Sequence, residues 1–120
     1  MDHVIFDVMN ARVTFKNVPL HELSKFAFKD VGAAADEFKK IPGVDECIII
    51  QTASRIEIFT VSNTETVDSP DARRAEGKTL ILNQVKDTWI NLTQLEQIDI
   101  DHFDQTIEVY KSDDVYLNLL

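Results

Sequence analysis

Residues 48–59, IIIQTASRIEIF, constrain the fold of this chain more than any other stretch. Two runs rich in isoleucine, typical of β-strands, lie on either side of a tight polar joint formed by residues 51–55. Strands joined by so short a connection pair antiparallel. We therefore predict a β-hairpin whose joint carries one charged side chain, Arg55.

The segment before the hairpin is predicted to hold one strand and two helices. Residues 4–16 read as a long strand, bent near Asn10. Pro19 favours a helix start, with apolar residues at helical spacing after it. Asp30 is a suitable cap for a second helix, which the Pro42-Gly43 pair ends.

Within the hairpin, ECIIIQTA is almost wholly apolar, so we predict that it is a central strand of the sheet. A polar surface loop is expected over residues 62–72, with Ser69-Pro70 resembling a helix start. A helix follows from Asp71 to about Leu92, and Gly77 is a point where it can divide.

Residues 93–103 are predicted to be irregular or to make a short helical turn, with a final strand over residues 105–110. A helix capped by Ser112 then begins, and it reaches the final leucines without a stop signal, so we expect more protein to follow. The order strand, helix, strand, strand, helix, strand predicts an α+β fold, a ferredoxin-like βαββαβ sandwich with a C-terminal helix leading out of the domain.

Charge and cysteine content narrow the classes of function. The net charge is −9, and most of the acidic excess lies in residues 61–120, so sequence-independent binding to nucleic acid is not expected. The single cysteine, Cys47, excludes an internal disulfide and fits a reducing compartment. His3, His21 and His102 lack the spacing of metal ligands. We therefore expect a protein that binds no metal. The sequence shows no signal peptide pattern and no membrane-spanning run, so we also expect a cytoplasmic protein that binds no membrane.

Three segments, taken in order, resemble the N-terminal domain of glutamyl-tRNA reductase. ARVTFKNVPLHELSKFAF is similar to the opening of that family, in which a strand ends in His-Lys-Thr-Ala-Pro. IPGVDECIIIQTASRIEIF is similar to the segment centred on Thr-Cys-Asn-Arg, and IEVYKSDDVYLNLL is similar to the segment that enters a long connecting helix. The resemblance covers the whole chain, and its middle match is the most specific.

This resemblance implies a substrate, a cofactor and a domain plan. A cysteine thiolate attacks glutamyl-tRNA to form a thioester, which NADPH bound to a separate domain reduces to glutamate-1-semialdehyde, the first step of the five-carbon route to tetrapyrroles. Residues 1–111 would be the N-terminal domain. Residues 112–120 would begin the helix to an NADPH-binding domain that this chain lacks, so no cofactor is expected on the chain itself. The full-length family members form homodimers through C-terminal helices.

By position, Thr52 and Arg55 match the glutamate-recognition residues of the family, and a bidentate arginine suits a carboxylate. Thr52, Ala53, Ser54 and Arg55 are therefore the expected substrate-binding residues. The alternative is that Arg55 is only a solvated hairpin charge and Thr52 only an ordinary strand residue.

The departures from the family concern its chemistry. Ala53 stands at the position of the nucleophilic cysteine, Ser54 at that of the asparagine, and Phe15 at that of an early histidine. Tyr110 stands at the position of the histidine thought to assist catalysis. An alanine methyl forms no acyl intermediate, Cys47 is too distant along its strand, and an unassisted serine is a weak nucleophile. Ala53 is either an engineered Cys→Ala exchange or a natural divergence, and the three other changes favour divergence.

Three hypotheses follow. The first is the substrate-recognition domain of a glutamyl-tRNA reductase, inactive as it stands. The second is a non-catalytic module, derived from that family, that binds glutamyl-tRNA or a protein. The third is a small regulatory α+β domain that binds a free amino acid. The predicted fold is the only observation that supports this third hypothesis.

Overall fold

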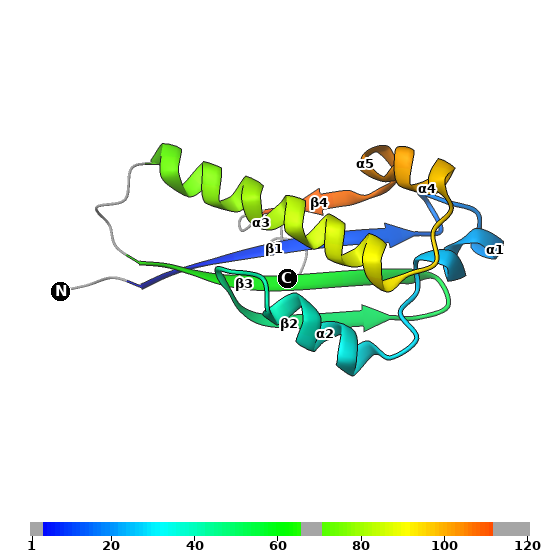
Figure 1. Cartoon of the computed structure of the whole chain (residues 1–120), viewed down its shortest axis with the longest axis horizontal. Helices are drawn as coiled ribbons and strands as arrows, with labels where there is room; N and C mark the ends of the chain where they lie inside the picture. Colours follow the sequence, from blue (N-terminus) through cyan, green and yellow to red (C-terminus); the bar gives the residue numbers. More distant parts are fainter. Residues whose placement is uncertain (1–3, 66–70, 112–120) are drawn as a thin grey trace.

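The computed structural model describes residues 4–65 and 71–111, as one antiparallel four-stranded sheet with helices packed on it (Figure 1). The strands follow the order β2-β3-β1-β4, and all three adjacent pairs are antiparallel. The strands are β1 (Val4–Thr14), β2 (Val44–Gln51), β3 (Arg55–Glu65) and β4 (Glu108–Tyr110). The helices are α1 (Leu20–Leu23), the 3₁₀ turn η1 (Ser24–Phe26), α2 (Val31–Lys39), α3 (Asp71–Leu92), α4 (Gln97–Asp101) and α5 (Phe103–Thr106). The chain therefore has an α+β fold.

The central pair of strands is formed by β1 and β3. They pair along their whole length, from Val4 opposite Glu65 to Thr14 opposite Arg55. The register runs unbroken through Asn10, and a register shift occurs instead in β2, between Val44 and Glu46. Because side chains alternate between the faces of a strand, every second residue of this pair points to the helices and the rest point to the opposite face.

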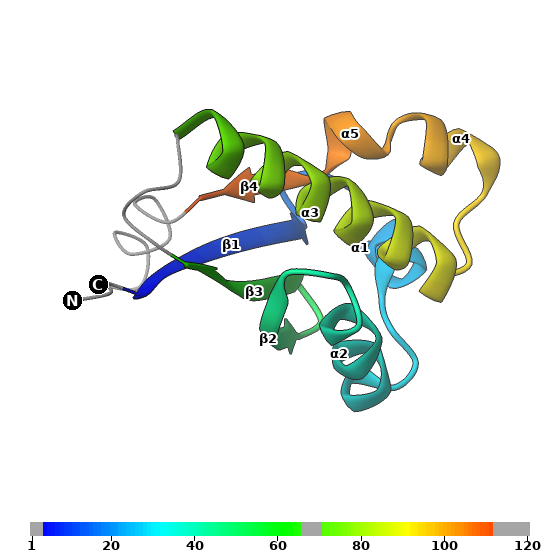
Figure 2. The same cartoon turned by 60° about the vertical axis from the view of Figure 1, so that its left-hand side comes forward.

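The helices α2 and α3 lie over one face of the sheet (Figures 1 and 2). The Asp30 side chain caps α2 by accepting a hydrogen bond from the Ala33 amide at 3.0 Å, as the sequence predicted. Beyond the end of α2, Gly43 has a φ of 94°, a left-handed conformation that glycine tolerates best. The predicted Pro42-Gly43 stop is therefore confirmed.

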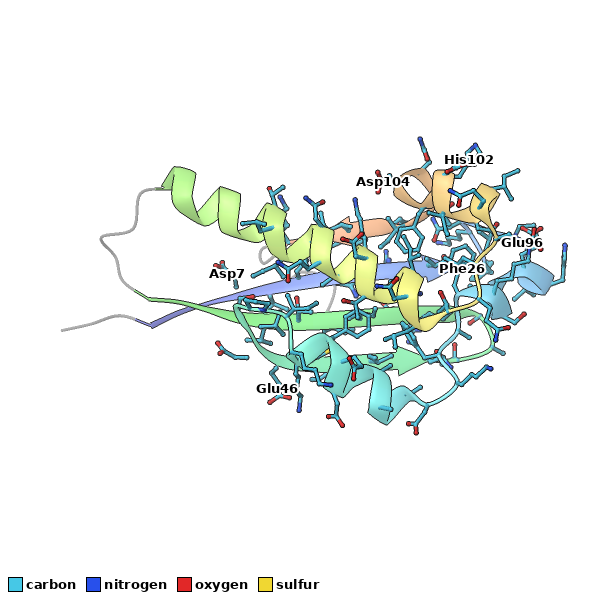
Figure 3. All side chains as sticks on the ribbon, in the orientation of Figure 1. Asp7, Phe26, Glu46, Glu96, His102 and Asp104 are labelled. Carbon is cyan, nitrogen blue, oxygen red and sulfur yellow. The ribbon has the colours of Figure 1, made fainter. Side chains whose placement is uncertain are left out.

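An aromatic cluster fills the core between the helices and the sheet. Trp89 on α3 is completely buried, and its indole Nε1 donates a hydrogen bond to the Phe26 carbonyl at 2.9 Å. Its ring also packs against Phe28 at 5.6 Å and Phe103 at 5.7 Å between centroids. Figure 3 shows Phe26 near the end of the sheet where β1 finishes. This cluster fixes the loop before α2, which in turn contacts the hairpin joint.

Some predicted elements differ from those observed. β2 is an edge strand and not a central one, because β1 takes the other side of β3. Ile48 and Ile50 of this edge strand also lie on the face away from the helices, and they are 55% and 38% exposed. The helix that begins after Pro19 ends at Leu23 and continues only as the turn η1. Within residues 93–103, α4 is the expected short helical turn, but α5 follows it, so the last strand begins at Glu108 and not at Gln105. The helix α3 runs undivided through Gly77. Ser69-Pro70 and the helix expected after Ser112 lie outside the described residues.

Among the residues that the structure describes, no helix is both long enough and apolar enough to cross a membrane.

Candidate functional site

The joint between β2 and β3 is exposed and locally hydrogen-bonded. Thr52, Ala53, Ser54 and Arg55 are all exposed. The Thr52 amide donates to the Arg55 carbonyl at 2.9 Å, which closes the hairpin. The Thr52 and Ser54 hydroxyls lie 3.4 Å apart, and the Ser54 amide donates to the Thr52 hydroxyl at 3.3 Å. The joint thus presents two hydroxyls and a guanidinium from four consecutive residues.

Two segments hold this joint in place. The Gln51 side chain exchanges two hydrogen bonds with the backbone of Phe28, accepting from its amide at 2.9 Å and donating to its carbonyl at 3.0 Å. On the other side, the Phe15 amide donates to the Ser54 carbonyl at 3.0 Å. The joint is therefore anchored to the aromatic core through Phe28 and to the end of β1 through Phe15, while the Phe15 side chain itself is 55% exposed.

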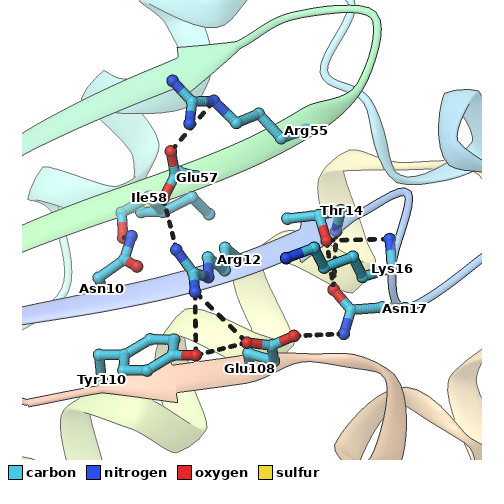
Figure 4. A network of polar contacts seen from close by, with 10 residues as sticks. All are labelled: Asn10, Arg12, Thr14, Lys16, Asn17, Arg55, Glu57, Ile58, Glu108 and Tyr110. Atoms are coloured by element: carbon cyan, nitrogen blue, oxygen red, sulfur yellow. Dashed lines mark hydrogen bonds and ion pairs between the residues drawn. The ribbon is translucent and has the colours of Figure 1, made fainter. Parts of the chain in front are cut away.

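The sheet face away from α2 and α3 carries a row of charged side chains. Arg12 on β1 lies opposite Glu57 on β3 and also opposite Glu108 on β4, because β1 is the strand between them. Arg55 and Tyr110 lie two residues from these glutamates along their own strands, so they share the same face. We call Arg55, Glu57, Arg12, Glu108 and Tyr110 the charge ladder (Figure 4).

Contacts run through the charge ladder from one member to the next. Glu57 Oε2 lies 3.4 Å from Arg55 Nε, and Glu57 Oε1 lies 3.6 Å from Arg12 Nη1. Arg12 Nη2 donates to the Tyr110 hydroxyl at 2.9 Å and lies 3.5 Å from Glu108 Oε2. The Tyr110 hydroxyl donates to Glu108 at 2.6 Å, and the Arg12 guanidinium also lies over the Tyr110 ring, 4.4 Å from its centroid.

Burial differs sharply within the charge ladder. The side chain of Glu57 is only 7% exposed, that of Arg12 is 26% exposed and that of Arg55 is 51% exposed. Burial by itself lowers the pKa of Arg12, but the hydrogen bond and the charge of Tyr110, with the charges of Glu108 and Glu57, outweigh it and raise the pKa overall. The pKa of Glu108 is lowered by hydrogen bonds from Tyr110 and Asn17 and by the charge of Arg12. Arg12 and Glu108 are therefore both ionised at neutral pH. Arg55 is the solvent-facing end of the ladder.

The structure brings together some of the predicted site residues and separates others. Thr52, Ser54 and Arg55 are adjacent at the joint, and Phe15 reaches it through its backbone. Tyr110 lies on β4, with β1 between it and β3, and it is opposite Asn10 and not opposite the joint. Among the residues that the structure describes, Arg12 and Glu57 connect Tyr110 to Arg55.

Neither candidate substitute for the missing cysteine is set up as a nucleophile. Cys47 is buried on the helix-covered face, where burial raises the pKa of its thiol to about 11, so the thiol is protonated at neutral pH. The hydroxyl of Ser54 has the Thr52 hydroxyl as its neighbour, which is not a base. In the described ranges no group of three or more His, Cys, Asp or Glu side chains is arranged to hold a metal ion.

Arg12, Glu108 and Gln51 were not identified from the sequence. Arg12 is a charged residue between the buried Ala11 and Val13, a pattern that marks an outward-facing position on a strand. The pattern predicts which face of the sheet Arg12 lies on. It does not predict which side chains Arg12 contacts, because these depend on the register of β1 with two other strands. Gln51 gives no signal, since its hydrogen bonds are made to the backbone of a distant loop.

Comparison with known proteins gives one family. The model of the glutamyl-tRNAGlu reductase N-terminal domain matches residues 11–120. The chain is 39% identical over 90 residues to a glutamyl-tRNA reductase from Cenarchaeum symbiosum (strain A), covering 75% of this chain and 18% of that protein. It is 28% identical over 79 residues to a glutamyl-tRNA reductase from Methanocella arvoryzae (strain DSM 22066 / NBRC 105507 / MRE50), covering 66% of this chain and 18% of that protein. The matched part thus spans about a fifth of the length of these relatives.

Proposed function

Because the chain belongs to the family of glutamyl-tRNA reductase N-terminal domains, we propose that it is the substrate-recognition domain of an NADPH-dependent glutamyl-tRNA reductase. The reaction of the whole enzyme would convert glutamyl-tRNA to glutamate-1-semialdehyde. The observation that carries the proposal is the joint itself: a half-exposed arginine and two hydroxyls, on a hairpin anchored at both sides.

In this proposal Arg55 binds the side-chain carboxylate of the glutamyl group. Its ion pair with Glu57 uses Nε, and half of the side chain is still exposed to a ligand. A guanidinium offers five N–H donors, so one contact with Glu57 leaves others for a second carboxylate. The hydroxyls of Thr52 and Ser54 lie beside it and supply neutral hydrogen bonds to the ester or the amino group.

The same joint lacks the atom that would carry out the chemistry. The side chain of Ala53 is an exposed methyl group, which cannot attack the ester. The Tyr110 hydroxyl donates to Glu108 and accepts from Arg12, so it is engaged away from the joint. These two observations favour a second candidate function, a non-catalytic module of the same family that binds glutamyl-tRNA.

We also propose a fold and domain plan for the chain. The observed elements and the strand order β2-β3-β1-β4 support a ferredoxin-like βαββαβ arrangement, extended by the short helices α1, α4 and α5. Residues 1–111 would form this domain, with a connecting helix from residue 112 to an NADPH-binding domain. Homodimerisation of the full-length protein and a cytoplasmic location belong to the same proposal.

The described residues do not fit NADPH. Dinucleotide sites use a glycine-rich turn between a strand and a helix, where the backbone approaches the pyrophosphate. Gly32 lies in the first turn of α2, after a loop, and the space beside Gly43 is occupied by Ile81, 3.2 Å from where a Cβ would stand. We expect the 120-residue chain neither to bind NADPH nor to reduce glutamyl-tRNA, and measurable NADPH binding to it would contradict the domain plan.

The experiment that tests the proposal restores the nucleophile. In the full-length protein, Ala53→Cys should allow radiolabelled glutamate to be trapped on the protein as a thioester, with Ala53→Ser as the matched control. Labelling of Ala53→Cys alone would support a reductase domain that lacks only its reactive atom. If the restored cysteine stays unlabelled while glutamyl-tRNA still binds, the non-catalytic module is favoured. Labelling of the unaltered protein would contradict this account of the joint.

A further inference from the structure

Glu57 is shared between two arginines of unequal burial. Its Oε1 lies 3.6 Å from Arg12 Nη1 and its Oε2 lies 3.4 Å from Arg55 Nε (Figure 4). A carboxylate whose side chain is only 7% exposed needs compensation for the water it has lost. Two guanidiniums supply that compensation, one from the middle of the sheet and one from the joint.

Arg12 is held firmly on its other side. Its Nη2 donates to the Tyr110 hydroxyl at 2.9 Å and lies 3.5 Å from Glu108, while the guanidinium stacks over the Tyr110 ring. Glu108 is fixed in turn by the Asn17 side-chain amide, which donates to it at 2.6 Å. Arg12 therefore cannot turn away from Glu57 without losing several contacts at once.

We propose that Arg12 is a positioning residue for Arg55: by neutralising part of Glu57, it keeps the Arg55 guanidinium available to a ligand carboxylate. This inference rests on the proposed function, in which that carboxylate is the one of the glutamyl group. Without Arg12, Arg55 would be the one arginine paired with Glu57. The stronger attraction would draw the Arg55 guanidinium along β3, away from the joint. An incoming carboxylate would also face a nearby negative charge with less compensation.

A pair of charged tRNAs isolates the carboxylate in the test. Glutamyl-tRNA and the same tRNA misacylated with glutamine differ only in that a neutral amide replaces the carboxylate. The ratio of their affinities for the full-length protein, the carboxylate preference, is measured for the unaltered protein, Arg12→Met, Arg55→Ala and the double variant. Such a cycle separates direct coupling from independent effects.

We expect Arg12→Met to lower the carboxylate preference about fivefold to tenfold when Arg55 is present, in the range of couplings between neighbouring charges. In the Arg55→Ala background, Arg12→Met should leave the preference unchanged. If Arg55→Ala lowers the preference but Arg12→Met does not, or if Arg12→Met acts equally in both backgrounds, the inference is overturned and the proposed function stands. If Arg55→Ala itself leaves the preference unchanged, the proposed role of Arg55 is overturned and the inference with it.

Arg12→Lys separates positioning from a purely structural role. Lysine keeps a positive charge opposite Glu57 but loses the planar fork that contacts Tyr110 and Glu108. We expect it to retain most of the carboxylate preference although its unfolding midpoint falls. A merely structural Arg12 would give lower midpoints for both variants with an unchanged preference, which would overturn the inference. If Arg12→Met does not fold, Arg12→Gln replaces it, because it removes the charge and keeps a hydrogen-bonding side chain.

Discussion

The two faces of the sheet are built by the same strands but use opposite physical chemistry. On the covered face, alternate residues of β1 and β3 pack with α2 and α3 around Trp89, and hydrophobic burial holds them together. On the other face, the charge ladder links three strands through ion pairs and hydrogen bonds. The covered face thus accounts for most of the stability, and the other face arranges charge around the hairpin joint.

The largest effect is expected on the covered face, from Trp89→Ala. This change removes a fully buried ring and its hydrogen bond to Phe26, so we expect a loss of about 3–5 kcal/mol in the free energy of unfolding. Urea denaturation followed by circular dichroism measures it. Trp89→Phe, which retains most of the buried ring, is the matched control and should cost clearly less. Equal midpoints for the Trp89→Ala variant and the unaltered chain would show that the core is elsewhere.

A smaller loss is expected at the centre of the charge ladder, from Arg12→Met. The change leaves two carboxylates with fewer partners, and we expect it to cost about 1–3 kcal/mol, the range for leaving a buried polar group unsatisfied. Adding Glu57→Gln should recover part of that loss, because the stranded charge is removed as well. Urea midpoints of the two single variants and the double variant measure the coupling. If the stability losses of the two single variants simply add up in the double variant, the Arg12–Glu57 contact does not contribute to stability.

The sequence predicted the covered face well and the charge ladder poorly. The long strand over residues 4–16, the Asp30 cap and the Pro42-Gly43 stop are predicted from local signals, and each was confirmed. The edge position of β2 was missed because an apolar run does not say which strand lies beside it.

The hairpin joint could be located from the sequence, because its residues are consecutive. The partners of Arg12 could not, since they lie 45 residues away on β3 and 96 residues away on β4 and depend on two registers. Long-range electrostatics is therefore the part of the site that only the folded chain reveals.

A modest pH effect is expected at the β4 end of the charge ladder. The pKa of Glu108 is lowered from its ordinary value of 4.5, so its contribution to stability is present above that pH and is lost as the pH falls through the lowered pKa. Because the pair is partly exposed, we expect less than about 1 kcal/mol. The midpoint difference between the unaltered chain and Glu108→Gln should shrink between pH 7 and about pH 3.5. A constant difference across this range would contradict an ionised, hydrogen-bonded Glu108.

The smallest effect on stability is expected from Arg55→Ala. Glu57 would keep Arg12 as its partner, and an ion pair of a half-exposed arginine contributes little. We expect a change below about 0.5 kcal/mol in the free energy of unfolding. Calorimetry or thermal denaturation of the chain would measure it. A loss comparable with that of Arg12→Met would make Arg55 a structural member of the ladder.

Two measurements on Arg55→Ala and Arg55→Lys, of tRNA affinity and of thermal stability, decide whether the exposed end of the charge ladder serves recognition and not folding. In the full-length protein, the affinity for glutamyl-tRNA relative to uncharged tRNA should fall by about 1.5–3 kcal/mol for Arg55→Ala, the range for a hydrogen bond to a charged group. Arg55→Lys should restore little of it, because an ammonium lacks the planar fork. The thermal midpoint should hardly change in either variant. A large fall in the midpoint with unaltered discrimination between the two tRNAs would show that Arg55 serves folding and not recognition.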